Sequence, residues 1–406
     1  MRYAVTSLEI TTPLPEIALE GDQRGLALLL RRNDRPIGFI LQPLAPATTL
    51  GPDELSGLIS LWCGIDLLED KLREELHEPA VQSSRPSVTV AVCTRDHPDL
   101  LAKCLHSLTR VRNAHDAASF EILVIDNAPP DEQTRGLVRS LGDVRYVCEP
   151  KPGLDFARNR ALAEATTDFV AFLDDDAEAD RGWWAGLEEA LSENPDAAVI
   201  TGLVLPFELE SDSQIMFERR GGFRRGFTKL RYRGDRLPGN PLFPTGAGMF
   251  GAGCNMVVHR QIALQLGGFD EALDTGPPLP GGGDIDMFYR VLRAGHPLVY
   301  EPRMLVFHKH RRETESLRRQ YWTWGTGFMA FVAKTYANDP SQRQKLRHLM
   351  RWWCVHHLNE LRYSFRGRGA VTPGLVASEL IGGLVGLAGT YQRSVRRIDR
   401  IRRVGG

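Results

Sequence analysis

The chain has 406 residues, of which 42% are hydrophobic and 25% are charged, as is typical of a globular protein with a sizeable core. Its formal net charge of −1 argues against nucleic acid as a partner, because nucleic-acid-binding domains are usually strongly basic. The six cysteines are scattered without a CxxC pair, so neither a zinc knuckle nor a secreted disulfide framework is expected.

The first 80 residues predict a small β-rich accessory module. Strands are expected at YAVTSLEI, LALLLRR and PIGFILQ, and a helix is expected from Pro52 to Leu76. The N-terminus lacks the apolar core of a signal peptide, which predicts a cytoplasmic location. The polar linker from His77 to Ser87 contains two prolines and predicts a domain boundary.

From Ser87 onward, short apolar strands alternate with helical segments of ten or more residues, which indicates an α/β fold with parallel strands. The expected strands are VTVAV, EILVIDN, VRYVCE, FVAFL and AAVITGLVL. Ligands of such sheets bind at the carboxyl ends of the strands. Thr94 and Arg95 follow the first strand, Asp126 lies at the end of the second, and three aspartates follow the fourth. We expect these side chains to share one rim of the sheet.

The three consecutive aspartates, Asp174, Asp175 and Asp176, predict a metal site. Hard cations such as Mg²⁺ or Mn²⁺ take oxygen ligands, and a cation would offset the repulsion among the carboxylates. The alternative is a solvated acidic turn, but the position directly after an apolar strand favours the metal site.

Two common nucleotide-binding loops are not indicated. GxxxxGK[ST] does not occur, which argues against a P-loop nucleotidase. GAGMFG, from Gly246 to Gly251, matches GxGxxG, but the preceding LPGNPLFPT contains three prolines and is not a central strand. We therefore expect no Rossmann dinucleotide site.

A glycine-rich loop ends in Asp284 and Asp286 at the head of the predicted helix DMFYRVLRAG. Carboxylates in the first turn of a helix are favoured by its dipole, so capping explains such residues. A general base in a mobile loop is the functional alternative. His308 follows the strand-like run RMLVF and is a candidate to complete a metal's ligand set.

Six segments in order, between Pro86 and His310, resemble the nucleotide-sugar-dependent glycosyltransferases of family 2, which are inverting enzymes with the GT-A fold. The segments are VTVAVCTRDHPDLLAKCLHSL, EILVIDNAPPD, KPGLDFARNRALAEATTDFVAFLDDDAEAD, GAGCNMVVHRQIALQLGGFDE, GGGDIDMFYRVLRAG and the histidine of VFHKH. The resemblance implies a mixed sheet flanked by helices over residues 86–312, between the N-terminal module (1–80) and a helical C-terminal extension (313–406).

The resemblance also implies residue roles in binding the sugar donor. Thr94, Asp126 and Arg158 would line the base pocket, with Arg95 and Asp175 beside them. Asp174 would lie near the ribose and the metal, and Asp176 and His308 would bind the metal. Asp284 would be the catalytic base. The family commonly has an acid directly before the base, and here that position is Gly283, which leaves Asp286 as the alternate base.

The implied reaction is a metal-assisted single displacement, with Mg²⁺ or Mn²⁺, that transfers a sugar from a nucleotide diphosphate to an acceptor hydroxyl. A UDP-sugar is favoured over GDP- and dTDP-sugars, and the acceptor is expected to be a glycan or a lipid-linked sugar. A metal-dependent nucleotidyltransferase and a non-catalytic glycan- or nucleotide-binding relative are the alternatives.

Two basic segments suggest further contacts. Glu218 to Arg236 carries eight Arg or Lys among aromatic residues, which suggests an acceptor loop for anionic groups or a solvated hairpin. Leu375 to Tyr391 is apolar and is followed by six arginines. This pattern suggests peripheral contact at the cytoplasmic face of a membrane, or a helix packed on the main domain.

Overall fold

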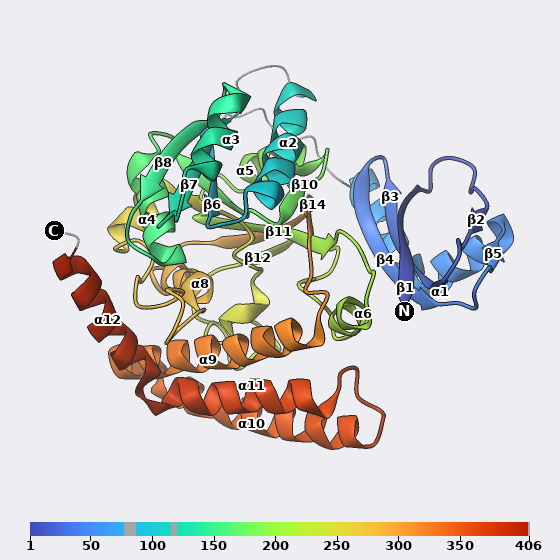
Figure 1. The fold of residues 1–406 in the computed structure, drawn as a ribbon. Coiled ribbons are helices and arrows are strands. Elements are labelled where there is room, and N and C mark those ends of the chain that lie inside the picture. Colours follow the sequence, from blue (N-terminus) through green and yellow to red (C-terminus); the bar gives the residue numbers. More distant parts are fainter. Residues whose placement is uncertain (77–86, 115–119, 405–406) are drawn as a thin grey trace.

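The computed structural model describes residues 1–76, 87–114 and 120–404. It has three parts: an N-terminal β-rich module, a central α/β body, and helices that lie below the body and end at α12 (Figure 1). The predicted linker lies outside the described residues, apart from Ser87.

The N-terminal module consists of a three-stranded sheet in the order β1-β3-β4, a two-stranded ribbon β2-β5 and one helix. The bounds are β1 (Arg2–Glu9), β2 (Ile17–Ala18), β3 (Gln23–Arg32), β4 (Arg35–Pro43), β5 (Thr49–Leu50) and α1 (Pro52–Leu76). In β3, Leu28 and Leu30 pack toward α1, whereas Leu29 packs with apolar residues of the central body. Since both faces of β3 are covered, this strand is a continuous apolar run.

The central body is built on a nine-stranded mixed sheet in the order β10-β14-β11-β13-β9-β6-β7-β8, with β12 also paired to β14. The bounds are β6 (Val88–Thr94), β7 (Glu121–Asn127), β8 (Arg145–Glu149), β9 (Phe169–Asp174), β10 (Ala177–Ala179), β11 (Val199–Pro206), β12 (Leu230–Tyr232), β13 (Asn255–His259) and β14 (Leu298–His308). The expected parallel pairing holds from β8 to β9, but β13 is antiparallel to both of its neighbours, β9 and β11. The predicted α/β class with a mixed sheet is confirmed.

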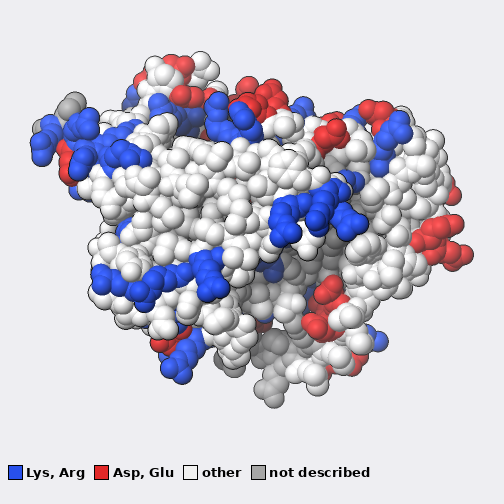
Figure 2. Space-filling view, turned by 90° about the horizontal axis from the view of Figure 1, so that it is seen from below, with Lys and Arg blue, Asp and Glu red and all other residues white. Residues whose placement is uncertain are grey.

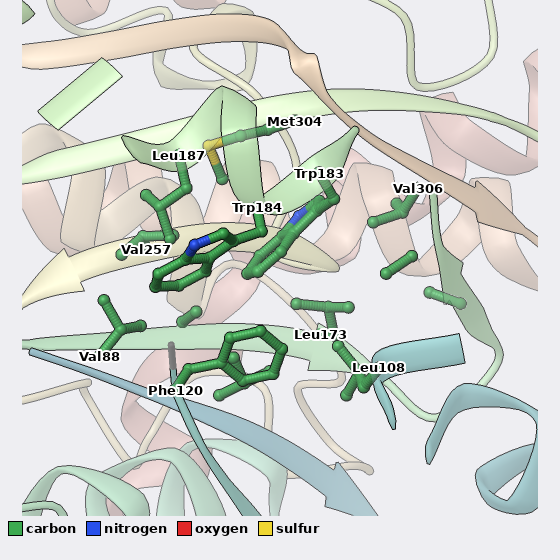
Figure 3. Close-up of a cluster of buried hydrophobic side chains, with 14 of the residues drawn as sticks. Val88, Leu108, Phe120, Leu173, Trp183, Trp184, Leu187, Val257, Met304 and Val306 are labelled. Atoms are coloured by element: carbon green, nitrogen blue, oxygen red, sulfur yellow. The ribbon is translucent and has the colours of Figure 1, made fainter. Parts of the chain in front are cut away.

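Helices cover both faces of this sheet. α2 and α5 pack on one face, and α4 and α8 pack on the other. The bounds are α2 (Pro98–Ala114), α3 (Gln133–Leu141), α4 (Leu154–Glu164), α5 (Trp183–Glu193), α6 (Asp212–Arg219), α7 (Arg260–Gln265) and α8 (Gly283–Arg293). Trp183 and Trp184 of α5 lie against Phe120 in the core, with ring centroids 6.2 and 5.0 Å from that ring (Figure 3). The two tryptophans at the start of α5 therefore pack this helix against the core of the central body.

The C-terminal extension is helical, as predicted. Its helices are α9 (Thr314–Asn338), α10 (Arg343–Phe365), α11 (Pro373–Val385) and α12 (Tyr391–Val404). The helical run Pro373–Arg403 is long enough to cross a membrane and contains an 18-residue window with a mean hydropathy of 1.3. One such helix is weak evidence for a span, because core helices pass the same criterion.

Candidate active site

The strand ends that carry polar residues lie side by side, as the alternation of strands and helices predicts. In the β6–β7 ladder Thr94 pairs with Asp126, and in the β6–β9 ladder Cys93 pairs with Asp174. Because these strands are parallel neighbours, Thr94, Asp126 and Asp174 occupy one rim of the sheet.

The third aspartate of the triplet contacts the predicted histidine. β10 pairs antiparallel with β14, and this pairing brings His308 Nε2 to 3.1 Å from Asp176 Oδ1. Burial alone would raise the pKa of Asp176, but the charge of His308 and its hydrogen bond lower it below its ordinary value. Burial would likewise lower the pKa of His308, and the carboxylate of Asp176 raises it. The contact therefore favours the charged form of each partner.

Asp174 forms a second cluster with His308 and with a residue that the sequence did not indicate, Cys254. One ligand atom from each of these three residues lies within 4.8 Å of the other two. Burial and the nearby Asp176 raise the pKa of Asp174, and burial raises that of the Cys254 thiol well above its ordinary value. His308 Nδ1 is buried and has no hydrogen-bond partner in the part of the chain that the structure describes.

These residues suit a divalent cation. Carboxylate oxygens and an imidazole nitrogen are ligands that Mn²⁺ accepts, and the oxygens also suit Mg²⁺. A cation would offset the desolvation of the half-buried carboxylate of Asp174, and it would give the unpartnered nitrogen of His308, in the neutral imidazole, a ligand role.

A cleft of about 530 Å³ joins this cluster to the predicted base. Asp174, His308 and Asp284 all line it, together with Arg319 and Trp324 of α9. The N–H of Gly253 donates to Asp284 Oδ2 at 2.9 Å, and the N–H of Ile285 donates to Oδ1 at 2.8 Å. Asp284 is thus held at the N-terminus of α8, where the helix dipole favours a negative charge.

The alternate base, Asp286, has a different environment. It is 1% exposed, and it forms ion pairs with Arg290 at 2.7 Å and with Lys334 at 2.6 Å. It is absent from the residues that line the cleft. These contacts make Asp286 a structural residue that joins α8 to α9.

Arg158 lines the same cleft and is held by two acids. Its guanidinium lies 2.9 Å from Asp155 and 3.3 Å from Asp274. Burial raises the pKa of Asp155 well above its ordinary value, although the charge of Arg158 opposes this effect. A Cβ added to Gly283 would collide with the carboxylate of Asp155. The absence of an acid at position 283 therefore has a steric reason: Asp155, from α4, occupies that space.

The remaining predicted donor residues lie on the rim but do not line this cleft. Thr94 donates a hydrogen bond of 2.6 Å to Asp175, and the Tyr146 hydroxyl donates one of 2.9 Å to Asp126. Asp126 is fully buried, and burial raises its pKa, although the bond from Tyr146 opposes this effect. Arg95 is exposed on the surface.

Comparisons with known proteins identify the central body. Residues 87–253 match glycosyl transferase family 2. Residues 87–253 form a family 2 glycosyltransferase domain. The mixed sheet flanked by helices agrees with the GT-A fold that the resemblance implies.

The family match covers only part of the site: it includes the aspartate triplet and ends before Cys254, Asp284 and His308.

 The predicted base Asp284 and two members of the cluster, Cys254 and His308, therefore lie outside the matched range.

Two curated relatives resemble the family 2 domain. The pre-mycofactocin glycosyltransferase of Mycobacterium tuberculosis is 28% identical over 236 residues, which are 58% of this chain and 45% of that protein. The succinoglycan biosynthesis protein ExoM of Rhizobium meliloti is 29% identical over 225 residues, which are 54% of this chain and 65% of that protein. This chain thus spans less than two thirds of either relative's own length.

One solved structure is also similar to this chain. It is a mannosyltransferase from Pyrobaculum calidifontis in complex with GDP-Man and Mn²⁺, at 15% identity and a TM-score of 0.47. The similarity covers 82% of this chain and 93% of that one. At this identity and TM-score, it does not bear on the activity of the family 2 domain.

The basic segment of the family 2 domain, Glu218 to Arg236, differs from the expected acceptor loop. Most of its cations bind groups of the protein itself. Arg220 pairs with Glu360 and Glu379, Arg224 with Glu218, Lys229 with Glu189, and Arg231 with Asp196, while Arg219 and Arg225 bind the Tyr3 hydroxyl and the carbonyl oxygen of Gly248. Six of the eight cations of this segment therefore contact other groups of the protein, so the segment is mainly structural.

Sequence reasoning missed three residues of the site: Asp155, Cys254 and Asp274. Asp155 and Arg158 stand three apart in a predicted helix, a spacing that places them on one face and could have indicated their pairing. Cys254 and Asp274 lie in loops far along the chain from their partners, and no local pattern indicates their positions.

Proposed function

We propose that this chain is an inverting glycosyltransferase, which moves a sugar from a nucleotide diphosphate to an acceptor hydroxyl in glycan, polysaccharide or glycolipid biosynthesis. The observation that carries the proposal is that Asp174, His308 and Asp284 line one cleft. A carboxylate that can accept a proton thus faces a cluster that can hold a cation, across a space of about 530 Å³.

Asp284 would act as the base. Each of its oxygens accepts one backbone N–H, so lone pairs remain for the proton of the acceptor hydroxyl. As the proton moves to Asp284, the acceptor oxygen bonds to the anomeric carbon and the bond from that carbon to the nucleotide diphosphate breaks. A single displacement of this kind inverts the anomeric configuration and requires one base.

Asp174, Asp176 and His308 would hold a divalent cation, Mg²⁺ or Mn²⁺. Such a cation, when bound, stabilises the negative charge that develops on the leaving diphosphate. Arg311, whose guanidinium lies 3.8 Å from Asp176, and Arg319, which lines the cleft, add positive charge on the same side.

The donor and acceptor are proposed by class. A UDP-sugar is favoured over GDP- and dTDP-sugars, and Thr94, Arg95, Asp126 and Asp175 would bind the donor from the rim. A glycan or a lipid-linked sugar would be the acceptor. A cytoplasmic location stays a prediction from the sequence.

The test separates donor binding from transfer. We expect Asp284→Asn to bind a nucleotide sugar in the presence of Mn²⁺ as the unaltered chain does, and to lose transfer by about 10²–10⁴-fold, because the amide does not accept the proton. Binding is measured by calorimetry against UDP-, GDP- and dTDP-sugars, and it should weaken when EDTA removes the cation.

Asp286→Asn is the matched control, since it makes the same chemical change one helical half-turn away. We expect it to lower the melting temperature by breaking the buried pairs with Arg290 and Lys334, while the folded fraction keeps its transfer activity. Loss of transfer only in Asp286→Asn would reverse the assignment of the base. A donor affinity that EDTA does not change would contradict the metal site. Transfer of the nucleoside monophosphate to the acceptor, with release of sugar 1-phosphate, would favour a nucleotidyltransferase.

A further inference from the structure

The outer sides of α10 and α11 expose large apolar side chains. Phe365 is 73% exposed and Leu384 is 62% exposed, although a folded protein usually covers such groups. We call this surface the apolar face, and it consists of Trp352, Val355, Leu358, Phe365, Ile381 and Leu384. A groove of about 430 Å³ runs along its α10 side, between Val355 and Phe365.

The exposed charges of the segment that carries the apolar face have one sign. Between Arg343 and Ile398 the chain contains two acidic residues, Glu360 and Glu379, and both turn inward to pair with Arg220. The exposed cations of α10 and the loop after it are Arg343, Arg347, Arg351, Arg362, Arg366 and Arg368. Figure 2 views the molecule from below and shows a broad uncharged surface with separate groups of Lys and Arg, while groups of Asp and Glu appear along the top and toward the right of the view.

We propose that the apolar face docks on the surface of an anionic lipid bilayer. Apolar and aromatic side chains bordered by arginines match the boundary between acyl chains and negatively charged headgroups. A second copy of this chain is a poorer occupant, because an interface made from this one patch would bring arginines of both copies together. Lipid supplies the complementary charge that a second copy lacks.

The contacts of α11 favour docking over insertion. A Cβ added to Gly382 would collide with the carbonyl oxygen of Trp322 in α9, and one added to Gly325 would collide with that of Glu379. α11 is therefore packed backbone to backbone against α9, and only its opposite side is available to lipid. The helical run also kinks at Ala388 and Gly389, before the arginine-rich α12.

α9 connects the apolar face to the cleft. Its residues Arg319 and Thr323 line the cleft, whereas Trp322 and Gly325 contact α11. A docked molecule would hold the cleft roughly two helix diameters, on the order of 20 Å, from the headgroups. This inference deepens the proposed function and rests on it for one point, that the acceptor is a sugar carried by a membrane lipid.

The test is cosedimentation of the full chain with phosphatidylcholine vesicles that contain or lack phosphatidylglycerol. We expect binding only to the anionic vesicles, and weaker binding as salt is added. Trp352→Ser/Leu358→Ser/Leu384→Ser should reduce vesicle binding by at least about tenfold. Arg362→Gln/Arg366→Gln should reduce it by about thirtyfold at low salt, from the contribution of each arginine near the surface.

The control alters an equally exposed apolar stripe elsewhere. Leu61→Ser/Ile65→Ser/Leu68→Ser changes α1, where acidic residues such as Asp66 and Asp70 surround the stripe, and it should leave vesicle binding unchanged. Absence of binding to anionic vesicles, or an equal loss in the α1 variant, would overturn the proposal. So would a dimer in sedimentation velocity that the α10–α11 variant abolishes. Nucleotide-sugar binding, measured on every variant, tests the proposed function separately.

Discussion

Glu189 of α5 lies among cations from three other segments of the chain. Its carboxylate is 2.6 Å from Lys229, 2.7 Å from Arg303 of β14 and 3.4 Å from Arg35 of β4. Burial alone would raise the pKa of Glu189, but Lys229 first, and then Arg35 and Arg303, lower it from 4.5 to about 2. Folding therefore favours the charged carboxylate.

The depressed pKa of Glu189 predicts a loss of stability in acid. The contribution is complete above pH 4.5 and disappears as the pH falls from 4.5 toward 2, because the unfolded chain binds the proton more tightly. Its size is about 3 kcal/mol at most. Urea unfolding at several pH values should show Glu189→Gln with a flatter profile in this window, and a profile parallel to that of the unaltered chain would contradict the assignment.

The two aspartates of α8 show why single residues of the site are hard to assign from sequence. Asp284 and Asp286 are two positions apart, so they point to nearly opposite sides of the helix. Only the packing of α8 decides which side faces the cleft and which meets Lys334. The resemblance to family 2 glycosyltransferases favours Asp284 as the base, whereas capping of the helix N-terminus explains an aspartate at either position.

At the level of elements, α9 and α11 approach closely because glycines face the contact. The carbonyl oxygen of Trp322 lies where a side chain at Gly382 would begin. Small residues at such a crossing allow the two backbones to pack without intervening side chains. The apolar run that resembles a membrane segment is thus, in part, a helix that packs on another helix.

Gly382→Ala is expected to destabilise this contact. The added methyl group meets backbone atoms that do not move freely, so α11 must shift, at a cost of about 1–3 kcal/mol. Gly374→Ala is the matched control in the same helix, because a Cβ there meets no atom within 4 Å. Thermal unfolding should show a lower midpoint for Gly382→Ala only. Equal midpoints would show that the close packing does not limit stability.

At the level of the whole molecule, the N-terminal module is fastened to the central body by a buried ion pair. Arg31 of β3 lies 2.6 Å from Asp180, and the two side chains are 5% and 7% exposed. Asp180 also accepts the N–H of Gly182 at the start of α5. The module therefore contacts the segment that directly follows the aspartate triplet and β10.

Arg31→Ala is expected to cost about 3–5 kcal/mol, because it leaves the carboxylate of Asp180 buried without its cation. Arg2→Ala is the control, since Arg2 bridges the same two parts through a more exposed pair with Glu210, 43% and 33% exposed, and should cost much less stability. Urea unfolding gives both values. If the two variants lose the same stability, the buried pair does not hold the module in place.

The order of strands and helices could be predicted from the sequence, because local patterns encode it. FVAFL followed by three aspartates indicates a buried strand that ends at a polar rim, and the structure has β9 ending at Asp174. The antiparallel insertion of β13 could not be predicted in this way, since strand order depends on contacts between distant segments. The same applies to Cys254, which reaches the site only because β13 lies beside β9.

The sequence by itself determined the family, the α/β class, and the rim where Asp174 and Asp176 are found, because these depend on residue type and local spacing. Tertiary structure decided which charged side chains pair with other groups of the protein. It directed the basic segment 218–236 largely toward protein carboxylates, placed Asp155 beside Gly283, and turned Glu360 and Glu379 inward to Arg220. The physical reason is that a charge acts on what lies within a few ångströms of it, and chain folding, not sequence distance, sets those neighbours.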